Sequence, residues 1–165
     1  GARSGKSKLA EQCAVESNLK LIYIATGTAG DDEMRERIAH HQASRDESWQ
    51  LVEEPINLAD TLLLHSNTES CILVDCLTLW LSNCLHHNCW VQQRDKLLAA
   101  FGQLSGKVIF VSNEVGMGIT PMGELTRRFV DESGFLHQQL ASMCDQVTLV
   151  VAGLSLQIKP AAENR

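Results

Sequence analysis

The sequence lacks a long uninterrupted apolar stretch. Its longest apolar runs, Cys71–Val74 and Cys76–Leu81, are separated by Asp75, and both are far shorter than the roughly 20 residues of a membrane span. The first residues contain no apolar segment of the kind that signal peptides carry. We therefore expect no membrane-spanning segment and no signal peptide.

An excess of positive charge is also lacking. Fourteen Lys and Arg stand against 20 Asp and Glu, which gives a formal net charge of −6. Nucleic acids and anionic membranes attract basic surfaces. The charge balance therefore argues against either of them as a general partner, although a local basic cluster remains compatible with phosphate binding.

Internal repeats, low-complexity segments and linkers are absent as well. The 165 residues, of which 44% are hydrophobic, fit one domain over 1–165 that buries roughly 70% of its unfolded surface, with a loose tail from Pro160 to Arg165. Six cysteines do not indicate a disulfide framework, because the chain is not a short secreted module. Four lie in apolar patterns typical of buried free thiols (Cys13, Cys71, Cys76, Cys144), so we expect a reduced, cytoplasmic protein.

Apolar runs alternate with helical patterns along the chain. We expect helices over 8–17, 31–45, 58–65, 78–85, 91–104 and 124–143, the last with a possible interruption at Gly134, and strands over 19–26, 49–53, 71–74 and 107–112. Two further β-like runs, 146–151 and 154–159, flank Gly153 and predict a C-terminal antiparallel hairpin. The alternation predicts an α/β fold, with a mostly parallel sheet covered by helices on both faces. Trp49, Trp80 and Trp90 are expected in the core or in subunit contacts.

The N-terminal stretch GARSGKS carries the most specific chemical signal. It ends in Gly5, Lys6 and Ser7, as does the phosphate-loop pattern G-x-x-x-x-G-K-[ST], and a predicted helix opens directly after it. In such loops the backbone N–H groups and the helix N-terminus hold an anion, the lysine neutralises phosphate charge and the hydroxyl binds Mg²⁺. The alternative is a flexible cationic N-terminus. The first glycine of the pattern and the strand that feeds the loop would precede Gly1, so we expect an N-terminally trimmed chain without that strand.

An acid suited to the same metal follows a buried strand. Asp75 comes directly after Cys71–Val74, at the carboxyl end of the predicted strand, where ligands bind in open α/β sheets. We predict that Ser7 and Asp75 bind Mg²⁺ together with GTP or ATP. The alternative role for Asp75 is to cap the helix that begins near Thr78.

Two adjacent histidines lie on the predicted helix over 31–45. His41 shares a helix face with Ile38 and Arg45, whereas His40 points about 100° away. A neutral imidazole is a nucleophile that can attack phosphorus, and Arg45 is placed to hold phosphate oxygens. A half-buried structural histidine is the alternative.

Together these motifs resemble the bifunctional adenosylcobinamide kinase / adenosylcobinamide-phosphate guanylyltransferase family of cobalamin biosynthesis. The matching stretches run nearly end to end: GARSGKS (1–7), YIAT (23–26), DDEMRERIAHH (31–41), ILVDC (72–76), SNEVGMGITP (112–121) and LVVAGLSLQIK (149–159). The resemblance implies a RecA-like P-loop NTPase fold and a homotrimer.

The resemblance also implies two reactions. ATP or GTP first phosphorylates adenosylcobinamide. GTP then guanylylates His41, not His40, with release of pyrophosphate, and the GMP passes to adenosylcobinamide phosphate to give adenosylcobinamide-GDP. The implied nucleotide contacts are Gly1, Ala2, Arg3, Ser4, Gly5, Lys6, Ser7, Ala25, Thr26, Gly27, Gln42, Ala43, Ser44, Arg45, Glu53 and Asp75.

Two other functions remain open at this point: a small-molecule kinase that uses the phosphate loop without guanylyl transfer, and a non-catalytic nucleotide switch. Glu114 has two readings, as the base of the kinase step or as an anchor for the turn over 113–118. The Cys84–Cys89 segment contains cysteines and histidines, but their spacing is unlike that of structural zinc sites.

Overall fold

The structure is a computed structural model that describes residues 1–27 and 48–160. The predicted helix over 31–45, with both of its histidines, lies outside the described residues, and so does the tail from residue 161.

A parallel sheet forms the centre of the described chain. Its strands are β1 (Lys20–Ala25), β2 (Trp49–Glu53), β3 (Ser70–Asp75) and β4 (Lys107–Val111). They lie in the order β2-β1-β3-β4, and every neighbouring pair is parallel. The first five residues of β3 are all buried, as expected for a strand that is covered on both faces.

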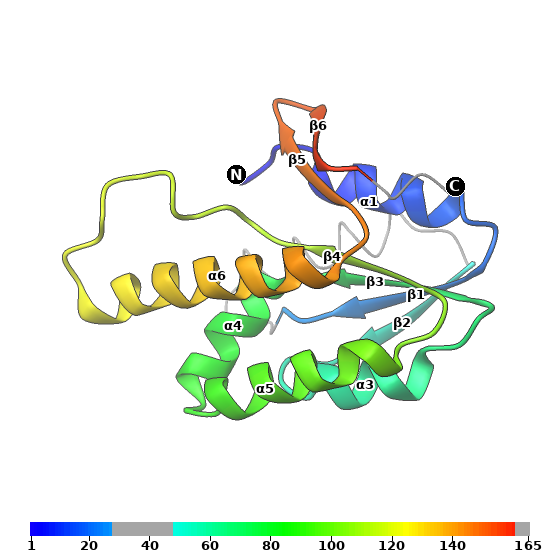
Figure 1. The fold of residues 1–165 in the computed structure, drawn as a ribbon, viewed down its shortest axis with the longest axis horizontal. Helices are drawn as coiled ribbons and strands as arrows, with labels where there is room; N and C mark the ends of the chain where they lie inside the picture. The colour runs from blue at the N-terminus through cyan, green and yellow to red at the C-terminus, as the bar shows by residue number, and fades with distance from the viewer. Residues whose placement is uncertain (28–47, 161–165) are drawn as a thin grey trace.

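Helices cover both faces of this sheet (Figure 1). They are α1 (Lys6–Val15), α3 (Leu58–His65), α4 (Leu77–His86), α5 (Trp90–Ala100) and α6 (Glu124–Met143), with a short 3-10 helix over Phe101–Gln103. Small residues let α1 approach one face closely, because Ala10 and Ala14 pack against β1 and β3. The other helices contribute to the larger core on the opposite face.

Two tryptophans lie at the centre of the larger core. Trp80 and Trp90 are 0% and 1% exposed, and their rings meet edge to face with centroids 5.3 Å apart. Each indole N–H keeps a partner, the Ile56 carbonyl for Trp80 and the Glu132 carboxylate for Trp90, as buried tryptophans require. The predicted core role is confirmed for these two residues.

The C-terminal hairpin forms a separate two-stranded sheet. Strand β5 (Val147–Val151) pairs antiparallel with β6 (Leu154–Lys159). Lys159 joins the hairpin to the end of α6, because its ammonium group donates to the carbonyls of Ala141, Ser142 and Cys144 at 3.0, 3.4 and 2.6 Å. These carbonyls lie in the last turn of α6 and at its C-cap, where the helix itself offers no N–H partner.

The predicted fold class is therefore confirmed, and the boundaries of the described elements differ from the predicted ones by a few residues. Helix α6 runs through Gly134 without a break. The expected burial of the cysteines holds for Cys71 and Cys76, whereas Cys13 and Cys144 are only half-buried. The alanines of α1 form its buried face and leave Cys13 at the margin, and Cys144 lies at the very end of α6. Within the described residues, no helix is long and apolar enough to cross a membrane.

Candidate functional site

Three of the predicted nucleotide contacts meet at the carboxyl edge of the sheet. Parallel pairing places Ala25 next to Glu53 on one side and next to Asp75 on the other. Side chains alternate between the two faces of a strand, so these three share the face of Tyr23 and Leu73, which packs against α1. The N-terminal loop and the two acidic strand ends therefore belong to the same face.

The N-terminal loop, residues 1–5, turns sharply before α1 begins. Arg3 and Gly5 have left-handed φ angles of 53° and 95°, and turns of this kind can aim backbone N–H groups into an anion-binding concavity. Ser4 is only 8% exposed, and its hydroxyl oxygen has no hydrogen-bond partner within the part of the chain that the structure describes. Since a buried hydroxyl is costly without a partner, Ser4 is a group that a ligand in this loop would satisfy.

Positive charge gathers where the loop meets the helix. The Lys6 ammonium group folds back to donate to the Gly1 carbonyl at 3.2 Å, and the N-terminus of α1 adds its own partial positive charge. Ser7, in the first turn, and Asp75 are both half-buried. A hydroxyl and a carboxylate are the oxygen donors that Mg²⁺ accepts alongside water and phosphate, so the chemistry of this pair fits the predicted metal.

The described residues form no metal site built from several protein ligands. Residues 1–27 and 48–160 contain no group of three or more His, Cys, Asp or Glu that could hold a metal ion. Mg²⁺ in nucleotide sites needs only one or two protein oxygens, because substrate phosphates and water complete its shell.

Thr26 stabilises the backbone at the carboxyl ends of β1 and β3. Its side chain is fully buried, and its hydroxyl accepts from the Cys76 N–H at 2.9 Å and donates to the Cys76 carbonyl at 2.7 Å. Its own N–H donates to the Asp75 carbonyl, and its carbonyl accepts from the Asn83 amide at 2.7 Å. The hydroxyl of Thr26 thus fixes the turn that carries Asp75. Sequence reasoning missed Asn83, because no local pattern marks a contact 57 positions away.

Adjacent glutamates at the end of β2 have different surroundings. One carboxylate oxygen of Glu54 accepts from the N–H groups of Ile56 and Asn57, at 2.9 and 2.7 Å, and so fixes the chain where it enters α3. Glu53, the residue predicted to contact the nucleotide, is exposed at the strand end.

The turn of the C-terminal hairpin closes over the N-terminal loop. The Gly153 N–H donates to the Ser4 carbonyl at 2.9 Å. A Cβ atom built on Gly5 would lie 3.4 Å from the Gly153 Cα, so the two backbones are in close contact. The position of Gly153 between two β-like runs predicted a turn, but the sequence did not predict that this turn would contact the N-terminal loop.

Polar groups also line the segment that leaves β4. The Ser112 hydroxyl and the His137 Nε2 are 2.7 Å apart, and the His137 Nδ1 is 3.9 Å from the Glu114 carboxylate. The other carboxylate oxygen of Glu114 accepts from the Gly116 N–H at 2.6 Å, which confirms the turn-anchoring role. Burial lowers the pKa of His137 below its ordinary value, and the Glu114 carboxylate opposes this shift.

Comparison with known proteins decides the family. The model of the family "Cobinamide kinase / cobinamide phosphate guanyltransferase" matches residues 1–158. The chain belongs to this family. It is 52% identical over 162 residues to the bifunctional adenosylcobalamin biosynthesis protein CobP of Pseudomonas aeruginosa, with 96% of this chain and 94% of that protein covered. It is 38% and 35% identical to the bifunctional adenosylcobalamin biosynthesis proteins CobU of Escherichia coli and Salmonella typhimurium, with 96% of each chain covered.

Family membership confirms the resemblance that the motifs indicated. All the nucleotide contacts and metal ligands predicted for this cobinamide kinase and guanyltransferase chain stay predictions. The predicted nucleophile His41 and the contacts Gln42, Ala43, Ser44 and Arg45 lie outside the described residues.

Proposed function

We propose that this chain catalyses both reactions named in its family. It phosphorylates adenosylcobinamide with ATP or GTP, and it then transfers GMP from GTP to adenosylcobinamide phosphate through a guanylyl-histidine. The observation that supports this most directly is the arrangement of two features on one face of the sheet, in a chain matched over 1–158. They are the strand-end acids and a loop with left-handed residues, whose buried Ser4 hydroxyl has no partner among the described residues.

In the kinase step, the chain positions and neutralises the nucleotide. The backbone of the N-terminal loop and the first turn of α1 bind the phosphates, and Lys6 neutralises their developing charge. Ser7 and Asp75 would hold Mg²⁺, which would further neutralise the phosphate charge. The acceptor hydroxyl attacks the γ-phosphorus, a new P–O bond forms, the P–O bond to the nucleoside diphosphate breaks, and the hydroxyl proton passes to water. Correct positioning and electrostatic stabilisation supply the catalysis without a protein nucleophile.

In the transferase step, His41 is the nucleophile. A neutral ring nitrogen attacks the α-phosphorus of GTP, a P–N bond forms and the P–O bond to pyrophosphate breaks. A phosphate oxygen of adenosylcobinamide phosphate then displaces the histidine, which regenerates the free imidazole and forms the new diphosphate bond. Covalent catalysis thereby divides one difficult transfer into two easier ones.

Two further features complete the proposal. We place the enzyme in the cytoplasm, supported by six cysteines that are all free, and we propose a homotrimer, supported by the family resemblance. Sedimentation equilibrium at micromolar concentrations gives three times the chain mass if the trimer is correct.

The decisive experiment labels the intermediate. The protein is incubated with Mg²⁺ and GTP that is radioactive at the α-phosphate, and the acid-labile, base-stable adduct is mapped by peptide mass spectrometry. The label is expected on His41; His41→Ala abolishes it and His40→Ala, the matched control, keeps it. GTP binding without any label would favour the kinase without guanylyl transfer.

The nucleotide loop is tested with a second matched pair. Lys6→Ala is expected to reduce phosphorylation of adenosylcobinamide by about a hundredfold or more, because the charge on the leaving nucleotide loses its partner. Lys8→Ala, two residues along the same helix and exposed, removes the same charge from solvent and leaves the rate near wild type. Equal rates for both variants would contradict a phosphate-binding loop at residues 1–7.

A further inference from the structure

A long arm connects the strand-end site with a pocket between two helices. The arm, residues 112–123, begins directly after Val111, which is the register partner of Asp75. It projects from the body before the chain enters α6 (Figure 1). The chain then enters α6, whose second residue, Leu125, lines the pocket, so the arm connects the end of β4 to the pocket.

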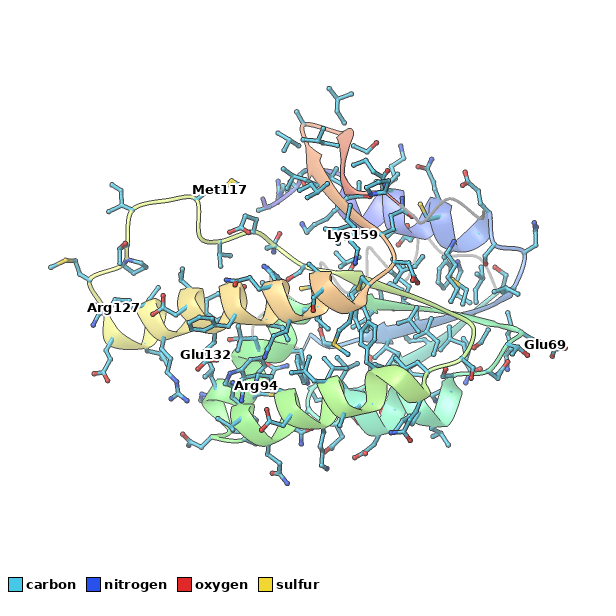
Figure 2. All side chains as sticks on the ribbon, viewed as in Figure 1. Glu69, Arg94, Met117, Arg127, Glu132 and Lys159 are labelled. Carbon is cyan, nitrogen blue, oxygen red and sulfur yellow. The ribbon has the colours of Figure 1, made fainter. Side chains whose placement is uncertain are left out.

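The arm carries large apolar side chains that nothing in the described chain covers. Met117, Ile119 and Met122 are 80%, 98% and 96% exposed, and Met117 stands well away from the sheet (Figure 2). Arg127 holds the end of the arm in place by donating to the carbonyls of Pro121 and Met122. Three large apolar side chains exposed within six residues offer a surface on which an apolar group can bind, and methionine adapts readily to the shape of a bound group.

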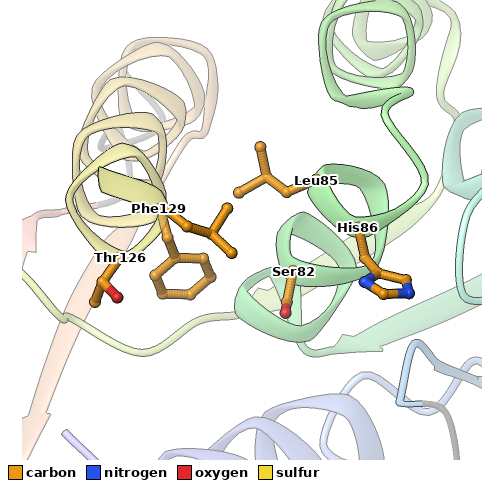
Figure 3. Close-up of a pocket in the computed structure, with 6 residues that line it drawn as sticks. Ser82, Leu85, His86, Thr126 and Phe129 are labelled. Atoms are coloured by element: carbon orange, nitrogen blue, oxygen red, sulfur yellow. The ribbon is translucent and has the colours of Figure 1, made fainter. Parts of the chain in front are cut away.

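The pocket has a volume of about 310 Å³ and mixed chemistry. Phe129 and Leu85 supply apolar walls, while Ser82, His86 and Thr126 supply polar groups at its sides (Figure 3). This volume is at the lower end for small-molecule sites. It accommodates one side arm of a large ligand and not the whole of it.

Helix α4 ties the pocket to the strand ends. Asn83, the neighbour of Ser82 on this helix, donates to the carbonyl of Thr26 directly beyond β1. The arm leaves the carboxyl end of β4 and helix α4 contacts the backbone just beyond β1, so the region made up of the arm and the pocket adjoins the carboxyl edge of the sheet.

We propose that this region binds the corrinoid substrate, with the macrocycle on the apolar arm and one of its carboxamide side arms in the α4–α6 pocket. The inference rests on the proposed function, which requires an acceptor far larger than a nucleotide. A corrinoid is a broad, flat, largely apolar ring with carboxamide groups at its periphery. The flat ring matches the exposed Met117, Ile119 and Met122, and a carboxamide finds hydrogen-bond partners in Ser82, His86 and Thr126.

The test measures binding of adenosylcobinamide by equilibrium dialysis, read from the visible absorption of the corrinoid. Ile119→Glu places a charge on the apolar arm and Ser82→Trp fills the pocket. Both positions are exposed, and unchanged melting temperatures verify that the variants fold. Each variant is expected to weaken binding by about tenfold or more.

Matched controls make the same changes elsewhere. Leu64→Glu alters an exposed leucine of α3, which is 79% exposed, and Ser142→Trp alters an exposed serine near the end of α6. Both controls are expected to bind the corrinoid like the wild type.

Three results would overturn the proposal, and they are distinguishable. Wild-type affinity, within about twofold, in both Ile119→Glu and Ser82→Trp refutes the subsite and leaves the proposed function intact. A wild-type protein that fails to bind adenosylcobinamide refutes the proposed function and the subsite together. If Ile119→Glu changes the mass in sedimentation equilibrium while Ser82→Trp binds normally, the arm is a contact between copies of the chain instead.

Discussion

Replacing Thr26 with valine tests whether one buried hydroxyl holds the strand-end site together. Valine has nearly the same shape, so the change removes hydrogen bonds and leaves the packing almost unchanged. The Cys76 carbonyl keeps a second donor, the Trp80 N–H at 3.2 Å. The Cys76 N–H, which donates to the Thr26 hydroxyl at 2.9 Å, loses that partner in a buried position.

The magnitude follows from these contacts. Two hydrogen bonds are lost, and one buried N–H is left unpaired, so we expect the free energy of unfolding to fall by about 2–3 kcal/mol. For a chain of this length that corresponds to a decrease of roughly 5–10 °C in melting temperature. Urea denaturation followed by circular dichroism measures the change directly.

Thr148→Val is the control, because it makes the same substitution in β5, where the threonine is half-buried. This control is expected to alter the free energy of unfolding by no more than about 0.5 kcal/mol. If Thr26→Val is equally mild, the Thr26 hydroxyl does not hold the Asp75–Cys76 turn and the reasoning is refuted.

Other predictions concern the helix end, the N-terminal loop and a buried imidazole. Lys159→Met leaves the last carbonyls of α6 without the ammonium donor and is expected to lower the free energy of unfolding, measured by urea denaturation, by about 2 kcal/mol. Lys20→Met, at an exposed strand end, is expected to change it little. Equal losses of stability in the two variants would contradict the capping role of Lys159. Gly5→Ala forces a side chain into a φ of 95° and is expected to cost about 1–2 kcal/mol of folding free energy and to weaken GTP binding in calorimetry. Gly102→Ala is the neutral control, because a Cβ at Gly102 would meet no described atom within 4 Å. Wild-type GTP affinity in Gly5→Ala would argue against a nucleotide-binding loop. Burial lowers the pKa of His137 below 6.5, so the unfolded chain takes up a proton first as the pH falls. The free energy of unfolding is therefore expected to decrease from about pH 6.5 down to the lower pKa of the folded state. His137→Gln should remove this part of the pH dependence, and an unchanged pH dependence of urea denaturation in that variant would refute the assignment to His137.

Local sequence patterns predicted the helices and strands, but they did not predict contacts between residues far apart in the sequence. The continuous apolar run before Asp75 predicted β3 and placed Asp75 at its carboxyl end. This was possible because the hydrophobic patterns of strands and helices involve residues close together in the sequence. The sequence predicts the helix that starts at Leu58 and, because asparagine is favoured just before a helix, Asn57 as its cap. The helix is confirmed, but the cap is wrong. Asn57 makes no side-chain cap hydrogen bond and instead accepts from the Gln93 amide, and the carboxylate of Glu54 takes the Asn57 N–H.

The supporting contacts of the site could not be predicted for the same reason. The bond from the Thr26 hydroxyl to the Cys76 backbone spans 50 positions, and the pocket between α4 and α6 exists only once both helices pack. The phosphate-loop motif and the family motifs identified the chemistry because their residues are consecutive. The geometry that surrounds them emerges only from the folded chain.

The contact between the Ser4 carbonyl and the Gly153 N–H joins the two ends of the described chain, and this has a consequence for biosynthesis. A ribosome makes the N-terminal loop well before it makes the hairpin turn. While the nascent chain is being extended, the loop lacks the backbone contact that closes over it. If this loop binds the nucleotide as proposed, we therefore expect full nucleotide affinity only after the hairpin turn has left the exit tunnel.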